Sequence, residues 1–426
     1  MNKMRVYIKT FGCSANKVEE EIIRRKLISS GFYITNSINN ADVIIVNTCT
    51  VRSETDLKIM KYLSLINKTN KKIIVTGCMA SAQPALIAKN FPLCSIILPI
   101  SKIDEAIKNN IKICLNKEKP LDPFPHIDGI KASILIARGC LGNCSYCIVR
   151  IAKGTLKSIH YDIIKNNLLE ALDFGAKEIR ISAQDTGVYG YDIGVNLAFL
   201  LNKLIEIPKD FIMRIGMFKP SSILPFLNQL LDSYSSEKIY KFIHIPVQSG
   251  SNKILEKMNR GYDIETFKKV LNAFRERFPN ITFYTDIIVG FPGEEEYEFN
   301  ETYKLIMDIK PDKTHISRYT PRPHTLAAAM PQIPEPIKKK RSKELSRITK
   351  EIQLEKNSKW IGKIIEALVI DKYGKNRILA RTKEYKNIII SNNISLSDCN
   401  IPLGEKIEVI IDDITPFYLI GKITKR

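Results

Sequence analysis

Three cysteines lie close together in the motif RGCLGNCSYC, which places Cys140, Cys144 and Cys147 in the spacing C-x3-C-x2-C. Three thiolates on one tight loop can bind three irons of a four-iron cluster and leave the fourth iron without a protein ligand. Zinc usually takes four protein ligands, so a zinc knuckle would have to borrow a distant one. Gly139 and Gly142 allow the backbone to wrap closely around a bulky group. The spacing favours an iron–sulfur cluster over zinc.

A second set of cysteines is spread over the first eighty residues, in FGCSAN, NTCTV and TGCMA. Each cysteine follows an apolar run that predicts a strand, and helical stretches separate the runs. The cysteines are Cys13, Cys49 and Cys78, after the predicted strands 4–10, 42–47 and 72–76. Each could be a small buried hydrophobe. Because the carboxyl ends of parallel strands meet at one edge, the three together predict a second three-thiolate site.

Composition sets the class of protein. The chain has 426 residues and a formal net charge of +20, with 44% hydrophobic and 26% charged residues. These proportions are typical of a globular protein. The basic surplus favours a polyanionic partner, chiefly nucleic acid, although a lysine-rich proteome gives the same balance. No apolar run approaches the ~20 residues of a membrane span, and MNKMRVYIKT lacks a signal-peptide core. We therefore expect no membrane partner and a cytoplasmic location.

Strand and helix patterns alternate again after residue 130. The predicted strands are 133–138, 178–184, 211–218, 242–248, 283–289 and 313–319. Six such repeats in about 200 residues predict a (β/α)6 partial TIM barrel. Active sites of such barrels lie at the carboxyl ends of the strands, and the Cys140 loop directly follows the first strand.

The expected fold class is α/β, with three domains. An N-terminal parallel α/β sheet domain covers 1–115, and a proline-rich linker covers 116–130. The central partial barrel covers 131–356 and ends in a helix at 336–356, in which residues 338–350 hold seven Lys or Arg and one Glu. Five short strand patterns in 357–426 predict a small OB-like β-barrel with an excess of basic side chains, a common oligonucleotide-binding scaffold.

The Cys140 motif after the first strand of such an arc resembles the radical S-adenosylmethionine (SAM) superfamily. The N-terminal cysteine trio narrows the resemblance to the methylthiotransferases, which carry an N-terminal cluster domain, a radical SAM core and a C-terminal TRAM domain. Further matching segments are HIPVQSGSNKILEKMNRGY (244–262), DIIVGFPGE (286–294), YTPRPHTLAAAM (319–330), GKIIEALV (362–369) and ARTKEYKNIII (380–390). The resemblance covers nearly the whole chain.

The resemblance implies two [4Fe–4S] clusters and SAM as cofactors. Cys140, Cys144 and Cys147 would hold the radical-generating cluster, on whose open iron SAM is cleaved to a 5′-deoxyadenosyl radical. The N-terminal trio would hold a cluster that carries the sulfur to be methylated and transferred to carbon. No catalytic side chain is assigned beyond the clusters. The implied partners are the anticodon loop of a tRNA, a low-potential electron donor such as a ferredoxin or flavodoxin, and a sulfur donor.

The segment IVRIAKGTLKSI (148–159) bears on the substrate. It departs from the bacterial pattern of the family at Arg150, Lys153-Gly154 and Ile159, and in this it resembles the archaeal and eukaryotic branch. That branch modifies N6-threonylcarbamoyladenosine at tRNA position 37 (t6A37). The basic helix and tail also favour RNA. Alternatives are isopentenyladenosine-37 of tRNA, an aspartate of a ribosomal protein, and a non-enzymatic RNA-binding protein held together by zinc or an iron–sulfur cluster.

Single residues outside the cysteine sets give further expectations. Ser182 and Gln184 end the second core strand and would contact SAM, or merely cap the strand. Gln248 and Gly290 end the fourth and fifth strands and would contact SAM or substrate. The predicted RNA contacts are Arg318, Arg322, Arg381 and Lys383, for which an exposed charged face is the alternative.

Overall fold

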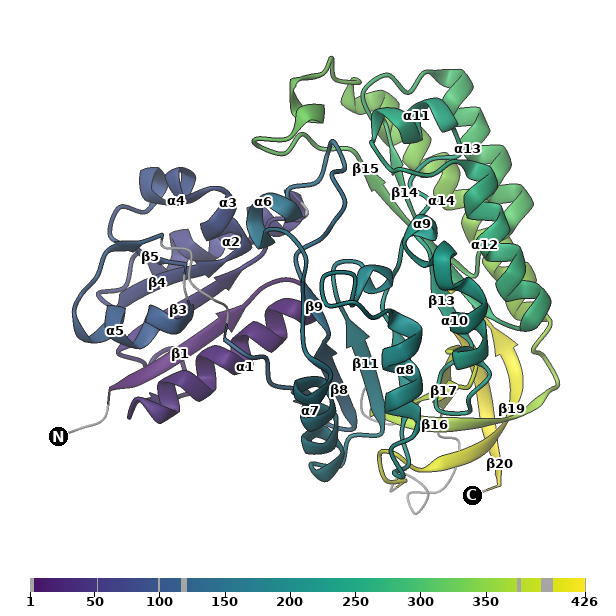
Figure 1. Cartoon of the computed structure of the whole chain (residues 1–426), viewed down its shortest axis with the longest axis horizontal. Helices are drawn as coiled ribbons and strands as arrows, with labels where there is room; N and C mark the ends of the chain where they lie inside the picture. Colours follow the sequence, from purple (N-terminus) through teal and green to yellow (C-terminus); the bar gives the residue numbers. More distant parts are fainter. Residues whose placement is uncertain are drawn as a thin grey trace.

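The computed structural model describes residues 4–51, 53–98, 100–115, 121–373, 377–391 and 401–425. They form a sheet domain at the N-terminus, a larger central arc of strands and helices, and a small barrel at the C-terminus (Figure 1). The predicted fold class is confirmed.

The N-terminal domain is a parallel sheet in the order β2-β1-β3-β4-β5-β6. Its strands are β1 (Arg5–Thr10), β2 (Tyr33–Ile34), β3 (Val43–Thr48), β4 (Lys72–Gly77), β5 (Ser95–Ile97) and β6 (Ile113–Cys114). The three strands that precede Cys13, Cys49 and Cys78 are the predicted ones. The other three have two or three residues each, which is too short for a periodic pattern.

Helices cover both faces of this sheet. They are α1 (Ser14–Ser29), α2 (Ser53–Ile66), α3 (Cys78–Ala82), α4 (Pro84–Asn90) and α5 (Ile103–Lys108), with a short 3-10 turn at Ile100–Lys102. Side chains of α2 and α4 pack with one face of the strands, and those of α1 and α5 pack with the other. A strand covered on both faces reads as a continuous apolar run, as VIIV in β3 does.

The central arc contains the six predicted strands in sequence order. They are β8 (Lys131–Leu135), β11 (Glu178–Ser182), β12 (Ile212–Ile215), β13 (Phe242–His244), β14 (Thr282–Val289) and β15 (Lys313–Arg318). Hydrogen bonds join β8, β11 and β12 into one parallel group and β13, β14 and β15 into another. An isolated parallel bridge between Met213 and Ile239 connects the two groups.

Helices line the outside of the arc. They are α7 (Tyr161–Asp173), α8 (Leu197–Ile205), α9 (Pro220–Ile223), α10 (Leu227–Tyr234), α11 (Asn252–Lys257), α12 (Ile264–Arg277), α13 (Glu296–Ile309) and α14 (Glu335–Ser358). Loops at the carboxyl ends of the strands add α6 (Val149–Lys153) and the short pair β9 (Ala137–Arg138) and β10 (Lys157–Ser158). The helix predicted at 336–356 is thus present.

The last residues of the predicted linker, 116–130, form a strand instead. Residues 116–120 lie outside the described part of the chain, but His126–Asp128 form β7, which pairs antiparallel with β8. A turn at Gly129, with φ of +60°, makes this a tight hairpin. β7 has only three residues and follows several prolines, so its sequence shows no alternating pattern from which a strand could be predicted.

The C-terminal domain is a closed barrel in the order β16-β17-β18-β20-β19. Its strands are β16 (Ile364–Lys372), β17 (Arg377–Thr382), β18 (Asn387–Ser391), β19 (Lys406–Ile414) and β20 (Leu419–Lys425). They match the five predicted strand patterns, and their inward aliphatic side chains form one core against which Trp360 packs.

This barrel docks against the amino ends of the arc strands, opposite the predicted site. Arg381 of β17 forms a buried ion pair with Glu178, the first residue of β11, and the hydroxyl of Tyr240 donates to the same carboxylate. Burial raises the pKa of Glu178, but the nearby guanidinium groups of Arg381 and Arg180 lower it more, so the pKa lies below its usual value. The carboxylate therefore remains charged in the interface.

A second buried carboxylate fixes the other side of this interface. Asp312, just before β15, accepts hydrogen bonds from Lys386 at 2.6 Å and from Lys356 at 2.7 Å. In the same interface, the ring of Tyr385 lies 4.5 Å from that of Phe242, centroid to centroid. The barrel therefore covers the amino ends of the arc strands, and we call this contact the floor interface.

No helix in the described residues is long and apolar enough to cross a lipid bilayer.

The buried pair predicts a specific stability effect. Arg381→Met removes one of the two guanidinium groups that pair with the buried Glu178 carboxylate and leaves Arg180, so we expect a cost of about 3 kcal/mol, the low end for a broken buried pair. At ~2 °C or more per kcal/mol, the midpoint of thermal unfolding falls by about 6 °C or more. Circular dichroism measures this midpoint. The matched control is Lys383→Met, because the partly exposed Lys383–Glu237 pair is worth about 0–1 kcal/mol. Equal midpoints for the two variants would contradict the docking role of Arg381.

Candidate active site

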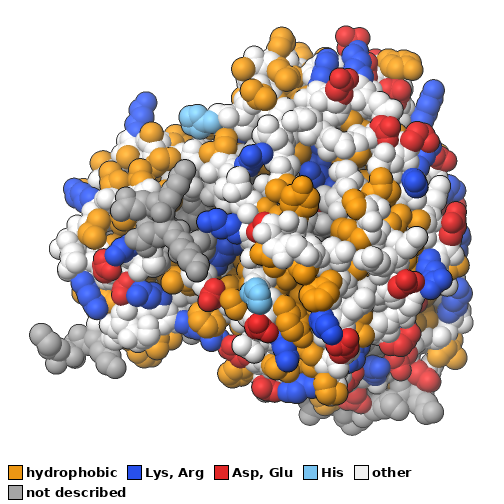
Figure 2. Space-filling view, in the orientation of Figure 1, with side chains coloured by type: hydrophobic (Ala, Val, Ile, Leu, Met, Phe, Trp, Pro, Cys, Tyr) orange, Lys and Arg blue, Asp and Glu red, His pale blue; other side chains and the backbone are white. Residues whose placement is uncertain are grey.

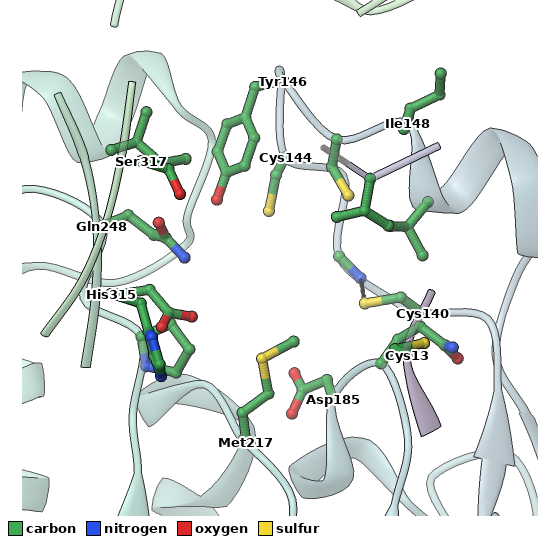
Figure 3. A pocket seen from close by; sticks show the side chains of 18 of the residues that line it. Cys13, Cys140, Cys144, Tyr146, Ile148, Asp185, Met217, Gln248, His315 and Ser317 are labelled. Carbon is green, nitrogen blue, oxygen red and sulfur yellow. Dashed lines mark hydrogen bonds between the residues drawn. The ribbon is translucent and has the colours of Figure 1, made fainter. Parts of the chain in front are cut away.

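A cavity of about 720 Å³ lies where the N-terminal domain meets the carboxyl ends of the arc strands. Five of the six predicted cluster cysteines line it, from both domains: Cys13, Cys78, Cys140, Cys144 and Cys147. Figure 3 shows Cys13 and Cys140 on one side and Gln248, His315 and Ser317 across from them. The two cysteine sets therefore face one space.

Two cysteines of the N-terminal trio, Cys13 and Cys78, lie beside the buried Asn16. The Asn16 side-chain oxygen lies 3.8 Å from the sulfur atoms of both Cys13 and Cys78. Its amide nitrogen donates to the carbonyls of Phe11 and Thr48, which fixes the side chain between the ends of β1 and β3. Cys49 is buried, and its Cβ lies 2.8 Å from where a side chain at Gly12 would begin. The ends of β1, β3 and β4 thus bring Cys13, Cys49 and Cys78 to one edge of the sheet.

Gly77 makes this convergence sterically feasible. Its φ of +86° belongs to the region that glycine tolerates best, and a Cβ there would lie 2.4 Å from the Asn47 side-chain oxygen. The backbone turns sharply at this residue, so Cys78 directly follows the strand as the first residue of α3.

The Cys140 loop is held by donors aimed at its sulfur atoms. The Gly142 amide donates to the sulfur of Cys140 at 3.2 Å, and Arg260 donates to that of Cys144 at 3.3 Å. Arg260 is buried and also donates to the Pro246 carbonyl, which fixes the guanidinium. Donors of this kind stabilise thiolates. Arg260 was not singled out from the sequence, because nothing in its spacing connects it to a cysteine more than a hundred residues earlier.

Burial raises the pKa of the Cys140 and Cys147 thiols, and it raises that of Cys78 to about 12. Without a compensating positive charge these groups stay protonated. A bound metal supplies that charge and deprotonates its thiol ligands. The environment is therefore suited to thiolates that are stable when metal is bound.

A buried ion pair connects the two cysteine-bearing segments. Lys153 of α6 follows the Cys140 loop, and Glu19 of α1 follows Cys13; their side chains are each 11% exposed and form an ion pair. Burial lowers the pKa of Lys153, but the nearby Glu19 carboxylate opposes this, and the pKa lies above its ordinary value, so the ammonium stays charged. Lys153 therefore joins the two domains.

The predicted SAM contacts are partly at the cavity. Ser182, Gln184 and Gln248 line it, and the side-chain oxygens of both glutamines are buried without a hydrogen-bond partner among the described residues. Gln248 also has a φ of +75°, a strained value for a residue with a side chain. Gly290 is not among the lining residues. A Cβ there would lie 2.3 Å from the Lys338 side chain, so this glycine allows α14 to pack closely.

The four predicted RNA contacts occupy different places. Arg318 and Arg322 line the cavity, but Arg322 is 7% exposed and forms an ion pair with Asp56 of α2, so it connects two domains. Arg318 is exposed and pairs with Glu335. Arg381 and Lys383 lie in the floor interface described above. Those two positions favour domain docking over contact with phosphate.

The structure also places a polar group in the cavity that the sequence did not reveal. His244, Asp286 and His315 come from three adjacent strands, and His244 Nε2 lies 2.9 Å from the Asp286 carboxylate. The histidines show no ligand pairing along the sequence. Their inward position on consecutive parallel strands was the signal that could have indicated their convergence.

Known proteins resemble the chain in both parts of this site. Residues 5–99 match a family described as "Uncharacterized protein family UPF0004", and residues 134–306 match the radical SAM superfamily. Among solved structures, the radical S-adenosylmethionine methyltransferase TsrM from Kitasatospora setae has a TM-score of 0.59 at 14% identity, covering 76% of this chain and 75% of that one. This likeness supports the fold.

Curated relatives match over the full length. A probable threonylcarbamoyladenosine tRNA methylthiotransferase of Pyrococcus horikoshii is 39% identical over 433 residues, 99% of each chain. One of Methanocaldococcus jannaschii is 40% identical and covers 86% of this chain and 88% of its own. The threonylcarbamoyladenosine tRNA methylthiotransferase of Homo sapiens is 32% identical over 98% of this chain and 74% of the human one. With two cysteine sets at one cavity and relatives of this identity over its whole length, the chain belongs to the radical SAM methylthiotransferases, in the branch that these archaeal and human proteins represent.

Proposed function

We propose that this chain converts t6A37 of tRNA to its 2-methylthio derivative. The main observation that supports this proposal is that cysteines of both sets line one cavity. A group that carries sulfur and a group that starts radical chemistry would then act on the same substrate atom. The names of the archaeal and human relatives support threonylcarbamoyladenosine as the base.

We infer two [4Fe–4S] clusters, one for each cysteine set. The donor set fits, because each site offers three cysteines and a cavity large enough for the open iron to meet SAM or sulfur. When bound, the Cys140-loop cluster and SAM supply the radical that attacks the unactivated C–H bond, and the other cluster supplies the sulfur. Arg260 and the Gly142 amide would stabilise the thiolates of the loop. The side-chain oxygens of Gln184 and Gln248, which have no hydrogen-bond donor among the described residues, would accept hydrogen bonds from SAM or the base.

The RNA would reach this cavity along α14. Lys343, Arg347 and Lys350 are exposed on one face of this helix. They line a groove together with Ser342, Ser346 and Glu351, and Glu351 pairs with Arg347. The same two serines line the main cavity, so the groove is continuous with it. On the face in Figure 2, by contrast, basic side chains are interspersed with acidic ones. An unpaired anticodon base can be splayed into a pocket while basic residues hold its phosphates.

The reaction also needs electrons and sulfur from outside. We propose a low-potential electron donor such as a ferredoxin or flavodoxin, together with a separate sulfur donor. Both would be found in the cytoplasm, where the tRNA is modified.

Nucleoside analysis tests the substrate. Deleting the gene should remove 2-methylthio-t6A from bulk tRNA and leave t6A in its place, as measured by mass spectrometry. Complementation with the intact gene is the control. If 2-methylthio-t6A persists while a ribosomal protein loses the mass of a CH3S group, the substrate is wrong.

Iron content tests the two clusters. After anaerobic reconstitution we expect about eight irons per chain, four for each cluster. Changing Cys13, Cys49 and Cys78 to Ala should leave about four, because the remaining triad is intact. Changing Cys94, a buried core residue outside both triads, to Ala should leave about eight. An unchanged iron content in the triple variant contradicts the N-terminal cluster.

Charge reversal on α14 tests the RNA path. Changing Lys343, Arg347 and Lys350 to Glu should weaken tRNA binding and reduce its salt dependence by about one unit of slope for each lost phosphate contact. Filter binding at several salt concentrations measures both. The control changes Lys203, Lys209 and Lys269, on other helices or loops of the arc, to Glu and alters the net charge equally. Equal weakening by both sets would mean that net charge, not the groove, determines affinity.

A further inference from the structure

His244, Asp286 and His315 form a compact cluster in the wall of the cavity, away from the cysteines. One ligand atom from each side chain lies within 4.8 Å of the other two. His244 and Asp286 are held at 2.9 Å, and their side chains are 12% and 24% exposed. Figure 3 shows His315 on the cavity wall across from Cys13 and Cys140. The cluster is partly sheltered and faces the reaction space.

The sheet register explains why the three side chains meet. Asp286 pairs with His315 across β14 and β15, and His244 pairs with Tyr284 across β13 and β14. Residues opposite each other in adjacent strands, or two positions apart in one strand, project on the same side of the sheet. Three inward positions on adjacent strands of a rigid arc therefore present their polar atoms to one point.

The donor set is that of a metal site. Two imidazoles and one carboxylate are typical ligands of zinc and of ferrous iron, and three protein ligands leave open positions for a further ligand. With metal–ligand bonds of about 2.0–2.2 Å at tetrahedral angles, two ligand atoms on one ion lie about 3.4 Å apart. The His244–Asp286 contact of 2.9 Å is shorter than this and the 4.8 Å bound on the three atoms is longer, so the side chains would shift by about an ångström to meet one ion.

We propose that His244, Asp286 and His315 bind one divalent transition-metal ion in the cavity wall, separate from both cysteine sites. The ion would replace the hydrogen bond between His244 and Asp286. Its charge of +2 exceeds the single negative charge of Asp286, and Arg214 lines the same cavity. The open positions of the ion therefore suit an oxygen anion from whatever ligand the cavity holds. This proposal stands independently of the substrate proposed above.

Zinc binding to the reconstituted enzyme tests the site. Reconstitution occupies the six cluster cysteines, and dialysis against metal-free buffer removes loosely bound ions. The protein is then titrated with Zn²⁺, and the bound zinc is measured by mass spectrometry of the metal. The variant is His315→Gln. The matched control is His160→Gln, because His160 also pairs with a carboxylate, Asp162, at 3.2 Å, but on the exposed surface.

We expect the wild type and the His160 variant to bind one more zinc ion per chain than the His315 variant. Affinity at the site should fall more than about tenfold in that variant, because even changes to partners outside the ligand set cost 10–100-fold. Iron content and unfolding midpoint should match the wild type. Asp286→Asn, which keeps the shape of the side chain, gives a second variant with the same expected loss. Equal zinc in all four proteins, or no zinc in the wild type, overturns the proposal.

Discussion

The ion pair between Lys153 and Glu19 determines whether the two cysteine sets can work together. Its lysine follows one set and its glutamate follows the other, so this contact fixes the distance between two sites that belong to different domains. Because both side chains are buried, a change in domain orientation would leave a desolvated charge without its partner, at a cost of several kcal/mol. Arg322 and Asp56 form a second link of the same kind. The geometry of the cavity thus depends on charge pairing as much as on the folding of either domain.

Several basic side chains that raise the net charge act inside the molecule. Lys338 and Arg341 of α14 are buried, and Arg341 pairs with Glu294. Arg381 and Lys386 pair with Glu178 and Asp312 in the floor interface. The opposite face of α14 presents exposed basic groups beside the cavity. The net charge indicated the class of partner, while the location of each charge decides what it contacts.

The cysteines and the strands before them could be predicted because local patterns encode both. A run such as VIIV followed by a cysteine defines the position of that thiol at a sheet edge. Arg322 and Arg381 were predicted as RNA contacts and instead form ion pairs between domains, since a sequence does not distinguish an arginine on the surface from one in such an interface. Asn16, Arg260 and the His244 cluster depend on contacts between distant segments, and Gly290 was placed at the correct strand end but serves the packing of α14.

The central arc does not close into a full barrel, so it has two edge strands that need cover during synthesis of the chain. Its first edge, at β7 and β8, is covered by α1 of the preceding domain, and its last strand, β15, is packed against α14. An uncovered strand edge can pair with another chain. During synthesis α1 is available before the arc forms, whereas β15 stays uncovered until residues 335–358 leave the ribosome. The interval between those two events is when the nascent chain is most open to aggregation.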